Sequence, residues 1–315
     1  MKIAYLMYFD HNKSNEIIAI LNELTRQGDH VFVMINDQKA RDAVAIASMN
    51  KSTVHISHQQ EYAQEGDMSL ARGTLLQMKE ALETEDVSFD WFINLAEGML
   101  PVVSRQKIVE KLQAADQDFY FVARTEKEDP SLRAKLSRYY PYTSIVDFAR
   151  KKKFRGRNMR TAAFLNFLGF RRKLQDPYEI GSPWFLLKAD TARALADHFA
   201  YCSENFKLSW YAEQSIIPMM IHRFLPEEAH VNQDLRVIGP DGAWAEDQGL
   251  RPITREVLDA HPEALFGGAF LHSENRELFN EILDRYNSEG SDFSNPTPTD
   301  SGKLNRLVDS ISKQI

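Results

Sequence analysis

The sequence predicts an α/β fold in which a mostly parallel, twisted sheet is flanked by helices, and two observations lead to this prediction. Short apolar runs rich in β-branched and aromatic residues alternate with segments of helical period through the first hundred residues. The first two runs, Ile3–Tyr8 and Val31–Ile35, enclose a single helix, and a strand–helix–strand unit this short implies parallel pairing with a right-handed crossover. Such a sheet binds ligands beyond the carboxyl ends of its strands.

The remaining elements follow from local signals in chain order. Ser14 or Asn15 can cap the first helix, and Gly28 stops it. Short apolar runs predict further strands at Val54–Ser57, Trp91–Leu95, Phe119–Ala123 and Trp184–Leu187. Apolar residues at helical spacing predict helices at Ser69–Leu82, Gln106–Leu112, Thr191–Ala200 and Glu213–Phe224, the last being either a helix or a mixture of helix and strand.

Composition excludes several classes of protein. The 315 residues are 43% hydrophobic and 26% charged, which is typical of a soluble globular chain and unlike a collagen or a disordered protein. The single cysteine, Cys202, cannot form an internal disulfide, so we expect a cytoplasmic protein. The apolar run at the N-terminus is too short for a signal peptide or a membrane span.

Charge is unevenly distributed along the chain. Ten cations and no acid lie between Arg150 and Lys173, whereas the rest of the chain has 28 cations and 45 acids. We call this segment the basic island. It is either a solvated pair of basic helices that pack their aromatic residues inward or a surface for an anionic partner. We expect no nucleic-acid partner, because the chain has no recognisable RNA-binding or DNA-binding module and is acidic overall.

Several familiar catalytic motifs are absent from the sequence. It contains no GxGxxG, no Walker loop, no GxSxG elbow and no zinc-ligand spacing. The triplet Asp116–Asp118 has the spacing by which nucleotide-sugar transferases often hold Mn²⁺ or Mg²⁺. Its apolar run follows the acids instead of preceding them, so we interpret the triplet as a helix-to-strand loop and expect no metal site.

Two segments carry side chains suited to chemistry. Gly181 and Ser182 predict a turn that leads into an aromatic strand, in which Trp184 is either a core residue or a platform for a sugar ring. Glu213 lies between aromatic residues and an apolar run. It either caps the start of a helix or acts as a partly desolvated general base whose pKa is raised toward neutrality.

Four segments in order carry a resemblance to known enzymes: Glu65–Leu70, Trp91–Val102, Gly181–Phe185 and Tyr211–Glu213. They resemble glycosyltransferase family 14, the core 2 and I-branching β-1,6-N-acetylglucosaminyltransferases and their xylosyltransferase relatives. The second segment is similar to the family's Tyr-Phe-Ile-Asn-Leu-Ser-Gly-x-Asp-Tyr-Pro-Leu, and the third to its Gly-Ser-x-Trp-Phe. The resemblance covers roughly residues 1–285.

The resemblance implies a GT-A-like glycosyltransferase fold and an inverting, metal-independent transfer from a UDP-sugar, with no cofactor. It implies that Glu213 removes the proton from the acceptor hydroxyl. The expected sugar is GlcNAc, and xylose or another sugar is an alternative. The family's Phe-Ala-Arg-Lys-Phe run appears as Phe266–Phe270 without its lysine. A non-catalytic glycan-binding or assembly protein is therefore a further alternative.

Site residues and domains are predicted on the same basis. For donor binding we expect Arg251, Arg255, Asp37 and Gly66, with Arg251 as the cation for the diphosphate and Arg236 or His272 as substitutes. For contacts with the acceptor or the sugar we expect Glu97, Trp184 and Ser182. We expect one catalytic domain over residues 1–285, with a donor half at about 1–125 and an acceptor half at about 126–285, then a linker at 286–302 and a terminal helix at 303–315.

The resemblance also bears on partners and location. The animal members of the family have a membrane anchor and disulfides, which this sequence lacks, so it resembles a bacterial cytoplasmic relative that acts in surface polysaccharide or glycolipid synthesis. The expected acceptor is a glycan or a lipid-linked glycan. On this interpretation the basic island Arg150–Lys173 lies on an anionic membrane face as a peripheral contact.

Overall fold

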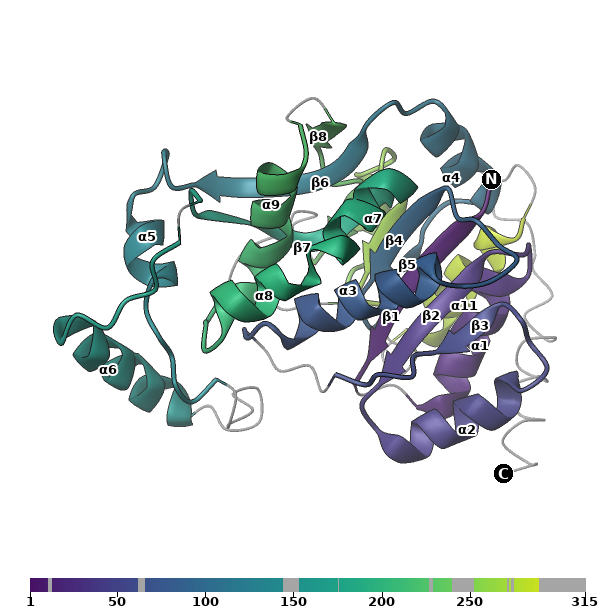
Figure 1. The fold of residues 1–315 in the computed structure, drawn as a ribbon. Helices are drawn as coiled ribbons and strands as arrows, with labels where there is room; N and C mark the ends of the chain where they lie inside the picture. Colours follow the sequence, from purple (N-terminus) through teal and green to yellow (C-terminus); the bar gives the residue numbers. More distant parts are fainter. Residues whose placement is uncertain are drawn as a thin grey trace. The chain divides into compact units, whose positions relative to one another are not determined.

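The computed structural model describes residues 1–10, 13–61, 66–143, 153–174, 176–226, 229–239, 252–270, 272 and 275–288. Most of the linker expected at 286–302 and all of the helix expected at 303–315 lie outside these residues. A mixed, mostly parallel sheet of seven strands, in the order β3-β2-β1-β4-β7-β6-β8, forms the centre of the fold, and helices flank it (Figure 1). The α/β prediction is thereby confirmed.

The elements have the following bounds. The strands of the large sheet are β1 (Ile3–Phe9), β2 (His30–Ile35), β3 (Val54–Ile56), β4 (Trp91–Leu95), β6 (Asp118–Thr125), β7 (Glu179–Lys188) and β8 (His230–Asn232). A second sheet, in the order β5-β10-β9, contains β5 (Leu100–Pro101), β9 (Arg236–Ile238) and β10 (Phe266–Gly268). The helices are α1 (Ser14–Thr25), α2 (Gln38–Ser48), α3 (Ser69–Leu82), α4 (Arg105–Gln113), α5 (Ser131–Leu136), α6 (Lys153–Phe167), α7 (Ala189–Asp197), α8 (Phe199–Phe206), α9 (Ala212–Phe224), α10 (Arg255–Asp259) and α11 (Arg276–Tyr286).

The chain forms two compact units, and each is interrupted in sequence. Unit 1 comprises Met1–Ser57, Ile93–Asp116 and Leu235–Ile315, and unit 2 comprises His58–Phe92 and Gln117–Asp234. The division into donor and acceptor halves at about residue 125 stays a prediction. Among the described residues, no helix is both long enough and apolar enough to cross a membrane.

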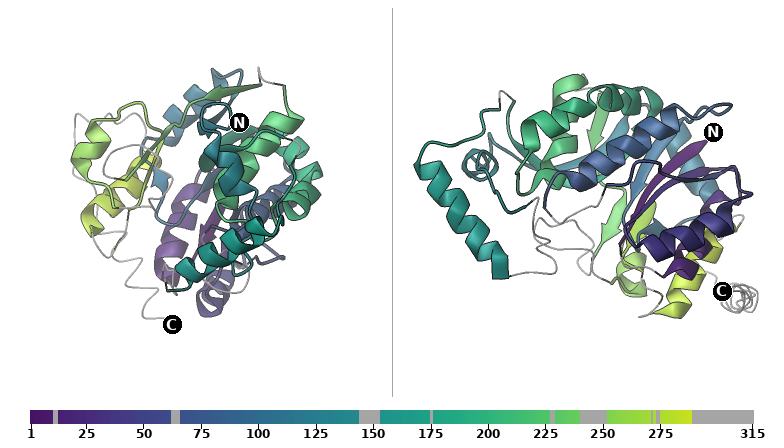
Figure 2. Two further views of the ribbon diagram at one scale, coloured as in Figure 1. Left: turned by 90° about the vertical axis from the view of Figure 1, so that its left-hand side faces the viewer. Right: turned by 60° about the horizontal axis from the view of Figure 1, so that its bottom comes forward.

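Unit 1 is built on the predicted strand–helix–strand start. β1 pairs with β2 in parallel, Phe9 lying opposite Ile35, and α1 packs against α2 and α11 (Figure 2). A charged group lies inside this unit: the Asp29 carboxylate is fully buried and accepts hydrogen bonds from the Arg105 guanidinium at 2.7 Å and from the Tyr286 hydroxyl at 3.0 Å. This network ties the first strand and the last described helix together, because Asp29 also accepts from the Ile3 amide at 3.2 Å.

Unit 2 contains an antiparallel pair, β6 and β7, with α9 packed against β7. Asp118 is the first residue of β6, so the predicted loop ends one residue earlier than expected. Its buried carboxylate accepts hydrogen bonds from the Lys188 amide and the Thr191 hydroxyl, both at 2.5 Å, at the start of α7. Burial raises the pKa of this carboxyl group. The Asp118 carboxylate thus stabilises the start of α7.

The described part of the basic island contains α6. The prediction that its aromatic residues pack inward is wrong at the carboxyl end of this helix, where Phe164 is 60% and Phe167 83% exposed. Phe154, at the other end, is half-buried against Tyr140 and Trp210. The difference arises because this cluster covers the beginning of α6, while the helix runs on beyond it.

Candidate active site

In unit 1, polar side chains follow the carboxyl ends of the two paired strands. Asp10 follows β1 and accepts a hydrogen bond from the Asn36 side chain, which follows β2, at 2.8 Å. Asp37, the next residue, caps α2 by accepting a hydrogen bond from the Ala40 amide at 2.8 Å, and its side chain is exposed. These three residues occupy the edge at which open α/β sheets bind ligands. Of the three, sequence reasoning named Asp37 and missed Asp10 and Asn36, although both lie within two residues of the end of an expected strand.

Within unit 1, the segment after β4 contacts Phe266–Phe270, the segment that stands where the family motif has its basic residues. Glu97 is half-buried, and the carbonyl of its neighbour Gly98 accepts a hydrogen bond from the Phe270 amide at 2.7 Å. A Cβ atom at Gly268 would lie 3.0 Å from the Cα of Met99, and Ala269 is 4% exposed. Positions 268 and 269 are therefore tightly packed, and the family's Arg and Lys would fit there only if the segment around Met99 moved.

The cations predicted as replacements lie in different surroundings. The Arg255 guanidinium forms an ion pair with Glu281 of α11, so it has a structural partner. Arg236 is buried in β9, where it donates a hydrogen bond to the Asn94 carbonyl at 3.2 Å. His272 lies 3.7 Å from a carboxylate oxygen of Glu16. Arg251 lies outside the described residues.

In unit 2, the candidate base Glu213 lies in the first turn of α9 and is half-buried. The preceding backbone is fixed by a hydrogen bond from the Ala212 amide to the Gly66 carbonyl, at 3.1 Å. Gly66 has φ +82°, and a Cβ atom there would touch the Trp210 ring at 3.5 Å. Gly66, predicted for the donor, is thus brought next to the helix that carries Glu213.

The residue before α9 has an unusual backbone. Tyr211 adopts the left-handed conformation, with φ +67°, which is costly for a residue with a side chain and is typical of functional sites. The Lys135 ammonium lies 3.5 Å from the centre of the Tyr211 ring, and the buried Trp210 ring packs beside it at 6.0 Å. These aromatic contacts hold the strained turn and, through it, the position of Glu213.

A bulge in β7 contains the segment predicted as a turn, so that prediction is wrong. Tyr120 pairs with Phe185 and Val122 with Gly181, which leaves Ser182–Trp184 outside the regular ladder. Gly181 is required here because a Cβ atom would lie 2.0 Å from the Phe121 carbonyl oxygen. Bulges re-aim side chains and are common beside active sites.

Inside the bulge, the two predicted contact residues have different roles. The buried Ser182 hydroxyl accepts a hydrogen bond from the Trp184 amide at 3.2 Å, which replaces a ladder bond. Trp184 itself is half-buried, so part of its ring is open to a ligand. Ser182 therefore supports the position of Trp184, and its predicted contact with a sugar stays a prediction.

We expect Gly181→Ala to lower the free energy of unfolding by about 1–3 kcal/mol, since the new methyl group forces the two strands apart. The same change should reduce any activity that depends on Trp184. The matched control is Gly156→Ala in α6, where a Cβ atom meets nothing within 4 Å and stability should rise by about 0.5–1 kcal/mol. Urea denaturation measures both, and equal stability of the two variants would contradict this account of the bulge.

No group of three or more His, Cys, Asp or Glu in the described part of the chain is arranged to hold a metal ion. The predicted site residues are divided between the two units. Asp37, Glu97 and Arg255 belong to unit 1, and Gly66, Ser182, Trp184 and Glu213 belong to unit 2.

The fold, with polar side chains beyond its strands and a carboxylate at a helix start, is consistent with the GT-A-like class of glycosyltransferases. The sequence profile of the core-2/I-branching enzyme family matches residues 3–238, and the chain belongs to that family. It is therefore a glycosyltransferase, and the resemblance to family 14 is confirmed. No curated protein matches the chain. The matched region includes Glu213 and ends before Arg251 and Arg255.

Proposed function

We propose that this protein is an inverting, metal-independent transferase that moves GlcNAc from UDP-GlcNAc to a hydroxyl group of a glycan acceptor. The Glu213 carboxylate takes the proton of that hydroxyl while its oxygen attacks C1 of the sugar. The bond between C1 and the diphosphate oxygen breaks, and UDP leaves with the electron pair. One attack from the face opposite the leaving group inverts the anomeric carbon.

The position of Glu213 at the start of α9 carries this proposal. In the first turn of α9 the Glu213 carboxylate lies at the end of the helix whose amide groups and dipole attract negative charge. The αL conformation of Tyr211 and the bond between Ala212 and Gly66 fix this helix start. A base held in one orientation contributes more to the rate than a mobile one.

Donor and acceptor roles follow from the surroundings in each unit. Asp37, at the end of β2 in a strand–helix–strand unit, has the position from which an acid commonly binds a ribose hydroxyl. We propose Arg251 as the cation for the diphosphate, since Arg255 is occupied by Glu281. Trp184 offers an open aromatic face for a sugar ring, and Glu97 offers a carboxylate for sugar hydroxyls.

The family is generally metal-independent, and we propose the same for this chain. Release of UDP from a panel of UDP-sugars, with an oligosaccharide acceptor, should continue at an unchanged rate in EDTA. UDP-GlcNAc should be the preferred donor. Activity that EDTA abolishes and Mn²⁺ restores would refute metal independence, and preference for UDP-xylose would refute the donor.

One observation favours a second function. Because Gly268 and Ala269 stand where the family motif has its cations, the second candidate is a glycan-binding or assembly protein that does not hold a nucleotide. Calorimetry with UDP separates the two functions. Measurable binding supports the transferase, and no binding together with no turnover supports the assembly protein.

The setting that we propose is the cytoplasmic face of a membrane, in the synthesis of surface polysaccharide or glycolipid. The support comes from the basic island, which suits a peripheral contact with anionic lipids near a lipid-linked acceptor. The single, fully buried Cys202 is compatible with a reducing compartment.

A further inference from the structure

The carboxyl end of α6 presents four large apolar side chains to solvent. Phe164, Phe167, Leu168 and Phe170 are 60%, 83%, 51% and 58% exposed, and together we call them the apolar tip. Phe164, Phe167 and Leu168 share one helix face, because residues three and four apart are neighbours. A contiguous apolar surface of this kind on a polar protein marks an interaction site.

The backbone holds the apolar tip in a defined shape. Gly169, with φ +85°, ends the helix, and its amide bonds to the Asn166 carbonyl at 3.1 Å. The Phe170 amide bonds back to the Leu165 carbonyl at 3.0 Å. These two bonds form a Schellman motif, which turns the chain sharply at the helix end. This turn places Phe170 close to the end of α6, where Phe167 lies.

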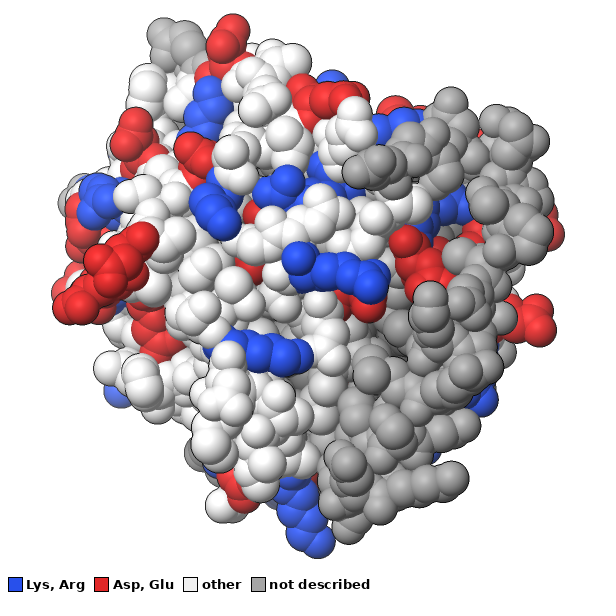
Figure 3. All heavy atoms as spheres, turned by 90° about the vertical axis from the view of Figure 1, so that its right-hand side faces the viewer, with Lys and Arg blue, Asp and Glu red and all other residues white. Residues whose placement is uncertain are grey.

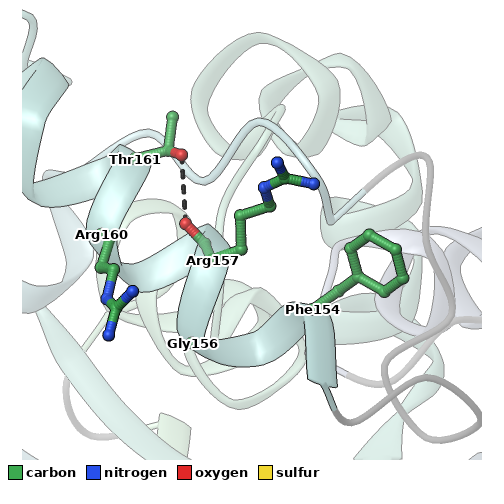
Figure 4. A pocket seen from close by; sticks show the side chains of 5 residues that line it. All are labelled: Phe154, Gly156, Arg157, Arg160 and Thr161. Carbon is green, nitrogen blue, oxygen red and sulfur yellow. Dashed lines mark hydrogen bonds between the residues drawn. The ribbon is translucent and has the colours of Figure 1, made fainter.

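Exposed arginines lie behind the apolar tip on the same helix. Arg157 and Arg160 continue the stripe that leads to Phe164, and Phe167 lies about 10 Å beyond Arg160 along the axis. With Phe154, Gly156 and Thr161, they line an open hollow of about 640 Å³. The two guanidinium groups point to different sides of the helix (Figure 4). A Cβ atom at Gly156 would meet nothing within 4 Å, so the hollow is accessible.

The beginning of α6 is anchored to the rest of unit 2. The buried Asn158 side chain accepts a hydrogen bond from the Tyr142 amide at 3.2 Å, and the Arg155 guanidinium lies 5.2 Å from the centre of the Trp210 ring. Figure 1 shows α6 extending away from β7 of the same unit. The apolar tip is thus the far end of a helix whose near end contacts the aromatic residues beside Glu213.

We propose that α6 is a membrane-docking element whose apolar tip inserts into anionic lipid, while Arg157 and Arg160 bind lipid phosphates. Interfacial segments bury their apolar side chains about 5–10 Å into the boundary between headgroups and acyl chains, and their Lys and Arg side chains attract anionic lipids. The charge is complementary, since α6 contains Lys153, Arg155, Arg157 and Arg160 and no acid. On the face shown in Figure 3, by contrast, basic and acidic side chains are interspersed.

Lipid fits the apolar tip better than the other anionic partners. Nucleic acid is bound by aromatic side chains on which bases stack, interleaved with cations. Here the apolar side chains gather at one end and include the aliphatic Leu168, which offers no stacking face. A second copy of the chain would bring two basic islands together in a symmetric contact, and their charges would repel.

The test is co-sedimentation of the full chain with phosphatidylcholine vesicles and with vesicles of equal parts phosphatidylcholine and phosphatidylglycerol. We expect binding to the second vesicle alone. The variant Arg157→Gln with Arg160→Gln should bind roughly 20- to 30-fold more weakly, since each cation near an anionic surface contributes about fivefold. The variant Phe164→Ser with Phe167→Ser and Leu168→Ser should lose at least about 50-fold.

Matched controls replace residues of the same kinds elsewhere. Ile46 and Met49 are 71% and 75% exposed in and after α2, so Ile46→Ser with Met49→Ser removes exposed apolar surface without affecting the apolar tip. Lys39→Gln with Arg193→Gln removes two cations outside the basic island. Both control variants should bind the anionic vesicles as the parent does.

A fluorescence measurement separates insertion from adsorption. Cys202 is fully buried, so Phe167→Cys allows a single environment-sensitive label at the apolar tip, and Lys39→Cys places the same label on α2. Anionic vesicles should shift the emission of the first label to the blue and leave the second unchanged. No shift at position 167, or full binding by the serine variant, would overturn insertion.

Other outcomes identify another occupant and also overturn the proposal. These are dimerisation that the serine variant abolishes, and salt-dependent oligonucleotide binding in the absence of vesicle binding. The proposal does not rest on the transferase chemistry. It does rest on the membrane setting proposed above. Vesicle binding by a chain that releases no UDP would leave it intact, and transfer to a soluble acceptor without vesicle binding would refute it and that setting while leaving the transferase activity established.

Discussion

Glu213→Gln is expected to lower the rate of sugar transfer by about 10²–10⁴-fold, the usual contribution of a positioned general base. Glutamine keeps the size of the side chain and removes its ability to take a proton. The amide fits the same half-buried place in the first turn of α9. Binding of UDP should be unchanged, because the donor residues that we propose include none on this helix. Product formation in a single turnover and calorimetry with UDP measure the two effects.

The control for this prediction is Glu204→Gln, which neutralises an exposed carboxylate on α8 of the same unit. It should leave transfer and thermal stability unchanged. A Glu213→Gln enzyme that keeps more than about a tenth of the parent rate would exclude Glu213 as the base. Loss of activity together with loss of folded structure would instead show that its carboxylate is needed to begin α9.

Arg105→Met is expected to lower the free energy of unfolding by about 3–5 kcal/mol, because it leaves the fully buried Asp29 carboxylate without its cation. The remaining donors to Asp29, the Tyr286 hydroxyl and the Ile3 amide, cannot neutralise its charge. Both β1 and α11 should therefore loosen. Guanidinium denaturation measures the loss, and hydrogen exchange of the β1 amides locates it.

Two further variants sharpen this test. Arg26→Met removes a cation that is 63% exposed and pairs with Glu23 within one helix turn, so its effect should stay below about 0.5 kcal/mol. Asp29→Asn combined with Arg105→Met removes the buried charge itself and should recover part of the lost stability. If the double variant is less stable than Arg105→Met, buried charge is not the cause of the loss.

Elements with a complete local signal could be predicted from the sequence. The structure has α3 at Ser69–Leu82 and β4 at Trp91–Leu95, with the predicted bounds, because apolar spacing alone determines which face or strand is buried. For the segment predicted at Glu213–Phe224 the sequence left a helix or a mixture of helix and strand open, and the structure has a helix, α9, that begins one residue earlier. The three-residue strands β8, β9 and β10 were not predicted, since their pairing depends on partners elsewhere in the chain.

Features that depend on distant partners could not be predicted. Gly181 and Ser182 have the composition of a turn, and only the pairing of β7 with β6 at Phe121 turns them into a bulge. The position of Gly66 beside α9 depends on a hydrogen bond with Ala212, far along the chain. The exposure of Phe164 and Phe167 could not be predicted either, because it depends on how much of α6 the aromatic cluster of Tyr140 and Trp210 covers.

The packing around Gly268 limits how this chain can change. Replacing Gly268 by Arg would place a side chain against the Met99 backbone, and replacing Ala269 by Lys would bury an ammonium group among apolar residues. Either change therefore requires the segment around Met99 to shift. A stronger diphosphate site in this chain is more readily built with cations at other positions.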